Sequence, residues 1–281
     1  MNGVEHYYFP GPTRWPIFGS MALLLMASGA ATWLNHGSAG PYLLAAGLGL
    51  LVYMLFGWFG TVIRESEGGL YNKQVDGSYR WSMGWFIFSE VMVFAALFCT
   101  LFYIRLISVP DLASGETAQL WPGFKGGWPT AGPGIEGTFQ PMATWGIPAI
   151  NTLILLSSGA AVTWAHWNLK KGNRRQLKLG LSITIALGVL FLCMQASEYR
   201  HAYTALNLNF GTGAYGATFF ALTGFHGFHV ALGTTMLIVI LARILRGQFT
   251  PEHHFAFEAV SWYWHFVGVV WLLLFVLVYW L

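Results

Sequence analysis

The residue of this sequence most suited to chemistry is Glu90, an acid near the middle of the apolar stretch 81–106. In a helix that rises ~1.5 Å per residue, Glu90 lies roughly 13 Å from Trp81, close to the centre of a hydrocarbon core about 30 Å thick. A carboxylate at that depth is costly unless it is protonated, paired or hydrated, so an intramembrane acid predicts a function. Three roles remain open from the residues alone: a proton-relay member, a protonated structural acid bonded to a neighbouring helix, or a reactive carboxyl facing lipid. The sequence shows no clear second carboxylate at matching depth.

Histidines form a second set of candidates. His226 and His229 stand at i and i+3, on one face of a helix, and the others of interest are His253, His254 and His265. Such residues can ligate haem or a non-haem metal. Haem held between helices needs facing histidines on two helices, however, and this sequence has only one HxxH motif and one HH motif.

The same histidines fit a structural role better. Polar side chains inside a membrane bundle commonly hydrogen-bond between helices, and small residues let the helices approach. Gly224, Gly227 and Gly233 accompany the HxxH motif. The pattern therefore favours interhelical hydrogen bonds over ligation. Glu198, near Arg200 at the end of an apolar stretch, is interpreted as a solvated or ion-paired acid at the membrane surface.

Charged residues at the ends of two apolar stretches suggest a lipid site. Arg64 and Glu65 close one stretch and Arg243 closes another. Juxtamembrane cations commonly extend to phosphates and fix topology. The more specific interpretation is a binding site for a lipid headgroup. Trp58 and Phe59 would then lie one to two turns deeper, beside the acyl chains.

The composition defines the class of protein. Of 281 residues, 56% are hydrophobic and only 9% are charged, and the mean hydropathy is +0.55. A soluble chain carries about 25% charged residues, so this is a polytopic membrane protein. The net charge of +3 and the lack of a basic block give no sign of nucleic-acid binding. Cys99 and Cys193 lie in separate apolar stretches, and neither a disulfide framework nor a thiolate metal site can be read from them.

Seven helical spans are predicted in a single membrane domain, 1–281. Their expected bounds are 15–34, 42–63, 81–107, 149–169, 177–197, 214–245 and 259–281. Each approaches or exceeds the ~20 residues needed to cross a bilayer. The first is interpreted as a retained span, not a signal peptide. Residues 108–144 form a long loop, rich in Gly, Pro and Trp, without helical periodicity.

The basic residues predict the orientation. With the N-terminus inside, eleven of the 14 Lys and Arg residues fall on the inner side, and only Arg105, Lys125 and Arg200 fall outside. Because positive loops stay on the inner side, the sequence predicts an N-in, C-out topology.

Nine short stretches carry a family resemblance. They are residues 62–66, 89–91, 151–153, 163–166, 172–174, 195–199, 223–230, 253–255 and 262–267. In this order they resemble the motifs of the subunit III family of the haem–copper cytochrome c oxidases.

That resemblance implies an all-α fold of seven helices in which spans 1–2 lean away from spans 3–7 and form a V-shaped cleft filled with phospholipid. It also implies a non-catalytic subunit without haem or copper of its own, since those centres belong to subunits I and II, which it contacts. Its expected role is to support proton uptake and turnover stability of subunit I in a proton-pumping respiratory oxidase. Cytochrome c is expected to reach the complex through subunit II. Seven spans also favour a cytochrome c oxidase over its quinol-oxidising relatives, whose subunit III is usually shorter.

The resemblance extends to individual positions. Glu90 resembles the family's carbodiimide-reactive carboxyl. The positions that resemble its lipid contacts are Trp58, Phe59, Arg64, Glu65 and Arg243.

Two residues depart from the family pattern. Gly268 stands where an Asp is usual, and Trp167 replaces the second His of a His-His pair. These departures and the basic loop at 170–178 favour a bacterial inner membrane over a mitochondrial one.

Two other classes of function remain as alternatives. One is a stand-alone membrane redox protein ligated by His226, His229, His253, His254 and His265. The other is a proton-coupled transporter that uses Glu90, for which inverted repeats or broken helices are expected but not found in the sequence.

Overall fold

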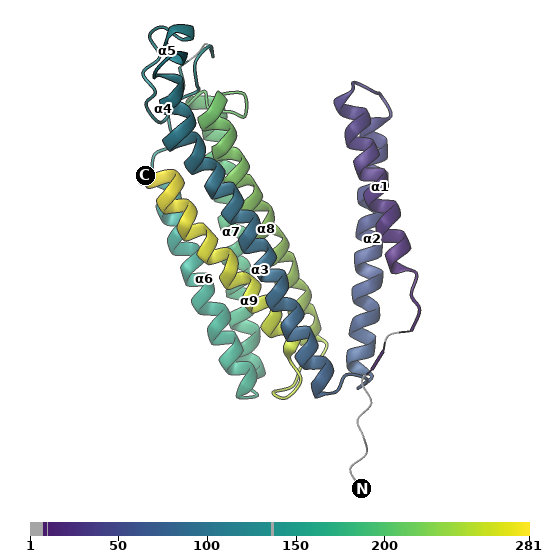
Figure 1. Cartoon of the computed structure of the whole chain (residues 1–281). Helices are drawn as coiled ribbons and strands as arrows, with labels where there is room; N and C mark the ends of the chain where they lie inside the picture. The colour runs from purple at the N-terminus through teal and green to yellow at the C-terminus, as the bar shows by residue number, and fades with distance from the viewer. Residues whose placement is uncertain (1–7, 10, 136–137) are drawn as a thin grey trace. The chain divides into compact units, whose positions relative to one another are not determined.

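The computed structural model describes residues 8–9, 11–135 and 138–281, and every regular element within them is a helix. Seven helices in these ranges are long and apolar enough to cross a membrane, which confirms the predicted all-α, seven-span class. The long helices are α1 (Trp15–Leu34), α2 (Gly40–Glu67), α3 (Lys73–Tyr103), α6 (Ile147–Lys170), α7 (Arg174–Ala205), α8 (Gly213–Leu245) and α9 (Phe255–Leu274) (Figure 1).

Several helices extend beyond the apolar stretches that predict them. α1 begins and ends where expected, whereas α3 starts at Lys73, before the expected Trp81, and α7 continues to Ala205. Hydropathy marks only the part of a helix that suits lipid, and backbone hydrogen bonding carries the helix into polar residues at either end. α7, for example, starts where the Gln176 amide donates to the Asn173 side chain at 3.2 Å, a normal N-cap.

The loop predicted for 108–144 contains short helices of its own. α3 continues through a π-helical turn (Ile104–Ser108) into α4 (Val109–Leu112), and α5 (Thr117–Leu120) follows. Further along, the Ala214 amide donates to Ala131 O at 2.9 Å, so this segment covers the start of α8. The lack of helical periodicity in the sequence thus missed these short helices, because helical turns of four residues leave no readable periodicity.

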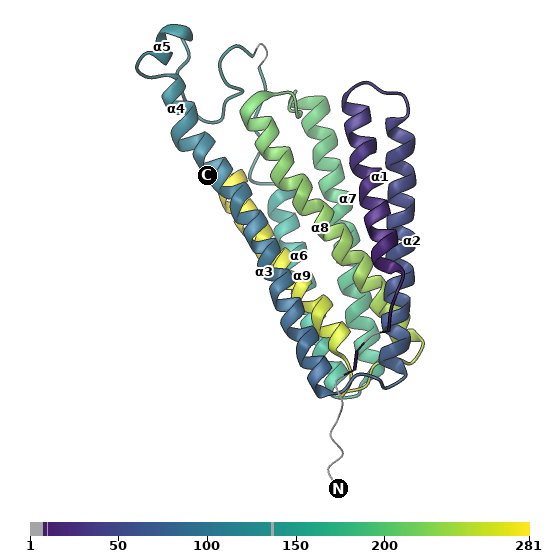
Figure 2. The same cartoon turned by 45° about the vertical axis from the view of Figure 1, so that its right-hand side comes forward.

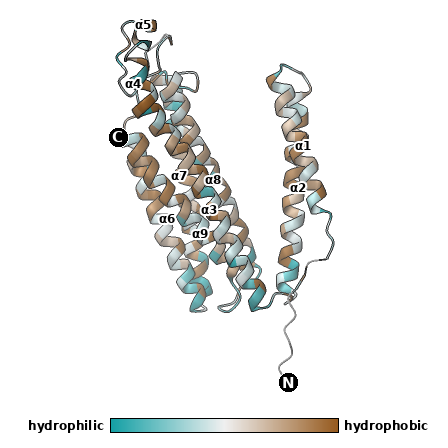
Figure 3. Cartoon of the chain, viewed as in Figure 1, coloured by the Kyte–Doolittle hydropathy of each residue, from teal (hydrophilic) through white to brown (hydrophobic). Residues whose placement is uncertain are grey.

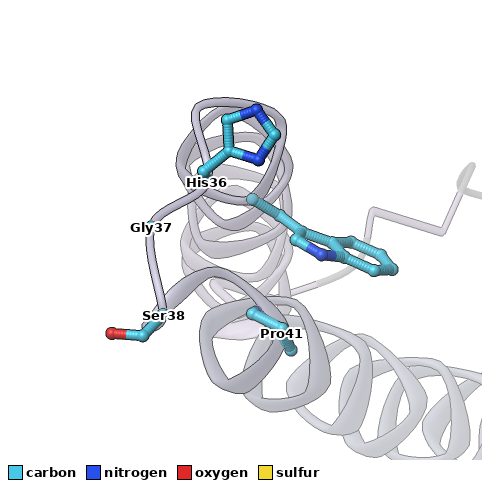
Figure 4. A pocket seen from close by; sticks show the side chains of 5 residues that line it. His36, Gly37, Ser38 and Pro41 are labelled. Carbon is cyan, nitrogen blue, oxygen red and sulfur yellow. The ribbon is translucent and has the colours of Figure 1, made fainter.

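The chain divides into two compact units, residues 1–81 and 82–281. In the first unit α1 and α2 pack as an antiparallel pair. A Cβ atom on Gly29 would lie 2.6 Å from Leu44 N, and one on Gly47 would lie 2.7 Å from Met26 Cγ, so these glycines set the close approach. The loop between the helices forms an open hollow lined by His36, Ser38 and Pro41 among others (Figure 4).

The second unit is a helical bundle with a continuous core. α6 packs against α7, α7 against α8 and α8 against α9, and α9 also packs against α6. Trp264 of α9 fills the centre, where a Cβ atom on Gly188 or Gly233 would come within 2.8 or 2.9 Å of its ring. α3 runs along α9 in both views, and Phe94 of α3 packs against Phe266 with ring centroids 6.0 Å apart (Figures 1 and 2).

Polar side chains bond the helices of this bundle to one another. Trp264 Nε1 donates to Ser158 Oγ at 3.0 Å, and Trp271 Nε1 donates to Thr152 Oγ1 at 2.9 Å. Both bonds join α9 to α6. In a bilayer, apolar side chains pack against lipid as favourably as against each other, so hydrogen bonds of this kind help to hold the helices together.

Hydrophobic residues run along the middle of the helices and hydrophilic residues gather towards several of their ends (Figure 3). This distribution fits helices that cross a bilayer. The single membrane domain, the V-shaped cleft and the N-in, C-out orientation stay predictions.

Candidate functional site

Glu90 makes a hydrogen bond inside the bundle. Its Oε2 lies 2.9 Å from Nε2 of His229, which joins α3 to α8. The side chain of Glu90 is 19% exposed and that of His229 is 6% exposed. The sequence shows no second carboxylate that could pair with Glu90, and in the structure its partner is a histidine.

The hydrogen bonds of His229 fix how many protons the pair holds. His229 Nδ1 lies 2.8 Å from the carbonyl oxygen of Phe225, which can only accept, so Nδ1 carries a proton. The bond from Nε2 to Glu90 then needs one more proton, either on the carboxyl or on the imidazole. In both arrangements the pair has no net charge. Loss of that proton would break the bond and leave a buried negative charge.

Aromatic rings surround the pair. The His229 ring centroid lies 5.2 Å from that of Phe94, 4.6 Å from Phe225 and 6.2 Å from Tyr263. These rings offer the pair little solvation, and an uncompensated charge there is expensive. The bond between Glu90 and His229 therefore lies in a largely apolar setting.

The other intramembrane histidines also bond between helices. His226 Nε2 donates to the carbonyl oxygen of Val267 at 3.1 Å, joining α8 to α9. His265 Nε2 lies 3.1 Å from Thr163 Oγ1, joining α9 to α6. The predicted interhelical hydrogen bonds are confirmed for His226, His229 and His265.

The glycines of the HxxH motif differ in what they contact. Gly233 meets the Trp264 ring, as close approach requires, and Gly224 has only ordinary contact with Tyr199. A Cβ atom on Gly227 would meet open space. The expectation that all three glycines permit close approach is thus wrong for Gly227, because it faces away from the neighbouring helices.

Glu198 is not at the surface. The prediction of a solvated or ion-paired acid is wrong, since Glu198 is 1% exposed while Arg200 is exposed. Residues two apart on a helix face nearly opposite sides, so Arg200 is poorly placed to pair with it. Among the residues that the structure describes, none makes a hydrogen bond of normal geometry to either carboxylate oxygen, although the Tyr279 hydroxyl lies nearby.

The predicted lipid contacts on α2 have different environments. Trp58 and Phe59 are exposed, and their rings stack with centroids 5.9 Å apart. Arg64 is exposed, with Nη2 donating to Thr61 Oγ1 at 3.2 Å. These three residues have the exposure that lipid contact needs.

Glu65, at the end of α2, accepts a hydrogen bond from within the chain. Its Oε2 accepts from the Tyr71 hydroxyl at 2.8 Å, and Tyr71 in turn accepts from Tyr79 at 3.2 Å. Burial, together with the hydrogen bonds to Tyr79 and Glu65, raises the pKa of Tyr71 well above its ordinary value. Glu65 thus anchors the connection between α2 and α3.

Arg243 belongs to the other unit and closes α8. Its Nε donates to Gln248 Oε1 at 2.7 Å, and its guanidinium lies 4.4 Å from the centre of the Phe249 ring. Arg174 supports the same loop by donating to the carbonyl oxygens of Gly247 and Phe249. Arg243 therefore presents its charge from a fixed position.

Neither departure from the family pattern disturbs the packing. Trp167 is exposed, and a Cβ atom on Gly268 would meet open space. Both positions lie on outer faces of the second unit.

The seven long apolar helices define a polytopic, all-helical membrane protein, and the Glu90–His229 pair joins two of them. Residues 5–281 match the family described as Cytochrome c oxidase subunit III. Relatives named Cytochrome c oxidase subunit 3 from Hippopotamus amphibius and Equus caballus are each 42% identical over 275 residues, covering 98% of this chain and 96% of theirs. The relative from Neotragus moschatus is 41% identical over the same coverage.

The chain belongs to the cytochrome c oxidase subunit III family. The family predicted from the motifs is therefore confirmed, and with it the function as a subunit of this respiratory oxidase. Family membership favours this function over the stand-alone redox protein and the transporter.

Proposed function

We propose that the chain is a non-catalytic core subunit of a proton-pumping cytochrome c oxidase, in which it contacts subunits I and II. Haem and copper reside in those two partners, and cytochrome c reaches the complex through subunit II. The chain binds phospholipid, supports proton uptake by subunit I and protects it during turnover. The observation that carries the proposal is the Glu90–His229 bond, a partly buried hydrogen bond that joins two helices.

The pair acts mainly by holding α3 against the bundle. A bond between neutral or mutually compensated groups in an apolar setting stabilises the contact, and breaking it leaves a polar group unpaired. Because carbodiimides activate a protonated carboxyl, a Glu90 that shares its proton with His229 is a suitable target for them. This accommodates the structural and the reactive roles of Glu90 in one arrangement.

Lipid contact on α2 involves two faces of the helix. At 100° per residue, Arg64 lies about 120–140° around the axis from Trp58 and Phe59, and about 8–9 Å along it. A guanidinium suits a phosphate, and the stacked rings suit acyl chains. The separation favours two neighbouring lipids over one, with Arg243 supplying a further cation on α8. Glu65 contributes by fixing the connection after α2.

The expected location is the inner membrane of a bacterium. Support comes from Trp167, Gly268 and the basic residues at 170–178, although the relatives named above are from mammals.

Purification of the tagged chain in mild detergent from its own cells tests the proposal. Haem a and copper are expected in the complex that co-purifies, together with phospholipid, and no metal centre from the oxidase is expected on the chain once it is separated. Haem or iron retained by the separated chain would overturn the non-catalytic role.

A further inference from the structure

A second cluster of ligating side chains lies at the junction of α6 and α9. His166 comes from the last turns of α6, His254 directly precedes α9, and Glu258 stands in its first turn. We propose that His166, His254 and Glu258 bind a divalent transition-metal ion, with zinc as the best fit. This site goes beyond the oxidase function and uses none of the residues proposed for lipid or proton roles.

The distances suit a metal. His254 Nε2 lies 3.0 Å and His166 Nε2 lies 3.4 Å from the same oxygen, Glu258 Oε1. All three ligand atoms lie within 4.8 Å of one another. Ligands about 2.0–2.1 Å from a tetrahedral zinc ion are roughly 3.3–3.4 Å apart. Small side-chain rotations therefore bring the set to zinc geometry without moving a helix.

The chemistry of the three groups points the same way. Two imidazoles and one carboxylate form a common zinc set that leaves a fourth position open. His166 Nε2 is buried and makes no hydrogen bond in the described part of the chain, although it faces the carboxylate. Glu258 Oε1 already lies 3.0 Å from His254 Nε2, so a proton is shared between these two groups. A metal ion would take the place of that proton and would give His166 Nε2 a partner as well.

The surroundings hold the ligands in place. The rings of His166 and His254 have centroids 5.6 Å apart and are inclined at 62°, and Phe257 packs beside His166. His254 and Glu258 are four residues apart, so they share one side of the helix start.

Lys170 is a positively charged group close to the proposed metal site, and its charge disfavours metal binding there. Its Nζ lies 3.9 Å from Glu258 Oε1, but its side chain is 54% exposed and can turn towards solvent. The ammonium thus acts as a competitor for the carboxylate. Replacing Lys170 with Gln is expected to lower the zinc Kd several-fold.

The test measures zinc in the purified oxidase complex. After treatment with a mild chelator, zinc chloride and desalting, the zinc content is determined by mass spectrometry relative to haem iron. His166→Gln, His254→Gln and Glu258→Gln should each hold one zinc fewer per complex than wild type. His253→Gln is the matched control, because His253 is the exposed neighbour of His254 and lies outside the cluster. Equal zinc content in wild type and the three ligand variants would overturn the site.

Two further measurements do not depend on whether the ligand variants assemble. Zinc X-ray absorption of wild type should show imidazole and carboxylate ligands at about 2.0–2.2 Å. Zinc bound without imidazole ligands contradicts the proposal. So does a zinc Kd that rises in Lys170→Gln, since removal of a competing cation can only strengthen this site.

Discussion

At the scale of single residues, the proton shared by Glu90 and His229 leads to a direct prediction. In Glu90→Gln the side-chain amide can donate to His229 Nε2, as a protonated carboxyl would. We expect this variant to assemble with normal haem and copper content and near-normal initial activity, while losing its reaction with carbodiimide. Metal analysis, turnover assays and mass spectrometry of the labelled chain measure these outcomes.

Glu90→Ala is the matched variant that removes the bond. His229 Nε2 then loses its partner inside the aromatic surroundings, which costs about 1–3 kcal/mol. The contact of α3 should loosen, so the complex should unfold at lower temperature than Glu90→Gln. Equal thermal stability of the two variants, or loss of haem insertion in Glu90→Gln, would contradict the supportive role of this pair.

The sequence predicted which residues belong to the site better than it predicted which residues they contact. The sequence marked Glu90 as an acid inside an apolar stretch, but its bond to His229 depends on how α3 and α8 pack, which no spacing along the chain reveals. Glu198 illustrates the same limit. Its neighbour Arg200 suggested a surface position, whereas the direction in which the helix turns each side chain made Glu198 part of the interior. His166, His254 and Glu258 likewise converge only once α6 and α9 are packed.

At the scale of helices, two glycines on α8 have different surroundings: Gly233 lies in a tight contact between helices, and Gly227 does not. A methyl group on Gly233 would lie 2.9 Å from the Trp264 ring, whereas one on Gly227 would meet open space. We expect Gly233→Ala to destabilise the bundle by about 1–3 kcal/mol through overpacking. Gly227→Ala should be neutral or stabilising by about 0.5–1 kcal/mol, because alanine favours the helix.

Thermal unfolding of the detergent-solubilised complex, monitored through this chain, compares the two variants. A Gly233→Ala protein as stable as Gly227→Ala would mean that α8 and α9 do not approach as described. Hydropathy could predict that α8 exists, and even its bounds at 214–245 agree within one residue with Gly213–Leu245. It could not tell which of its glycines faces another helix.

At the scale of the whole molecule, the lipid proposal predicts the behaviour of the complex during turnover. Each juxtamembrane cation contributes about 1 kcal/mol of attraction to anionic lipid, so Arg64→Leu combined with Arg243→Leu should cost about 2 kcal/mol. That corresponds to roughly 30-fold weaker retention. We expect less phospholipid per haem a after purification and faster inactivation during turnover.

Arg200→Leu is the control for this pair. Arg200 is an exposed cation that the predicted topology assigns to the opposite membrane surface. Its replacement should leave phospholipid content and inactivation unchanged. Unchanged phosphorus content in the double variant, or an equal loss in Arg200→Leu, would argue against specific lipid contacts at Arg64 and Arg243.

The orientation of the molecule in the membrane follows from its charge bias and can be tested directly. Lys171 lies in the basic turn between α6 and α7, and Lys125 lies in the long segment between α5 and α6. Cys99 and Cys193 are free thiols and are first replaced by alanine. In this background, Lys171→Cys should react with an impermeant maleimide only from the inner side, and Lys125→Cys only from the outer side. Because eleven of the 14 basic residues lie on the predicted inner side, reversal would place most of the positive charge outside. Labelling of Lys171→Cys in intact right-side-out vesicles would therefore refute the N-in, C-out topology, and with it the assignment of Arg64 and Arg243 to the inner surface.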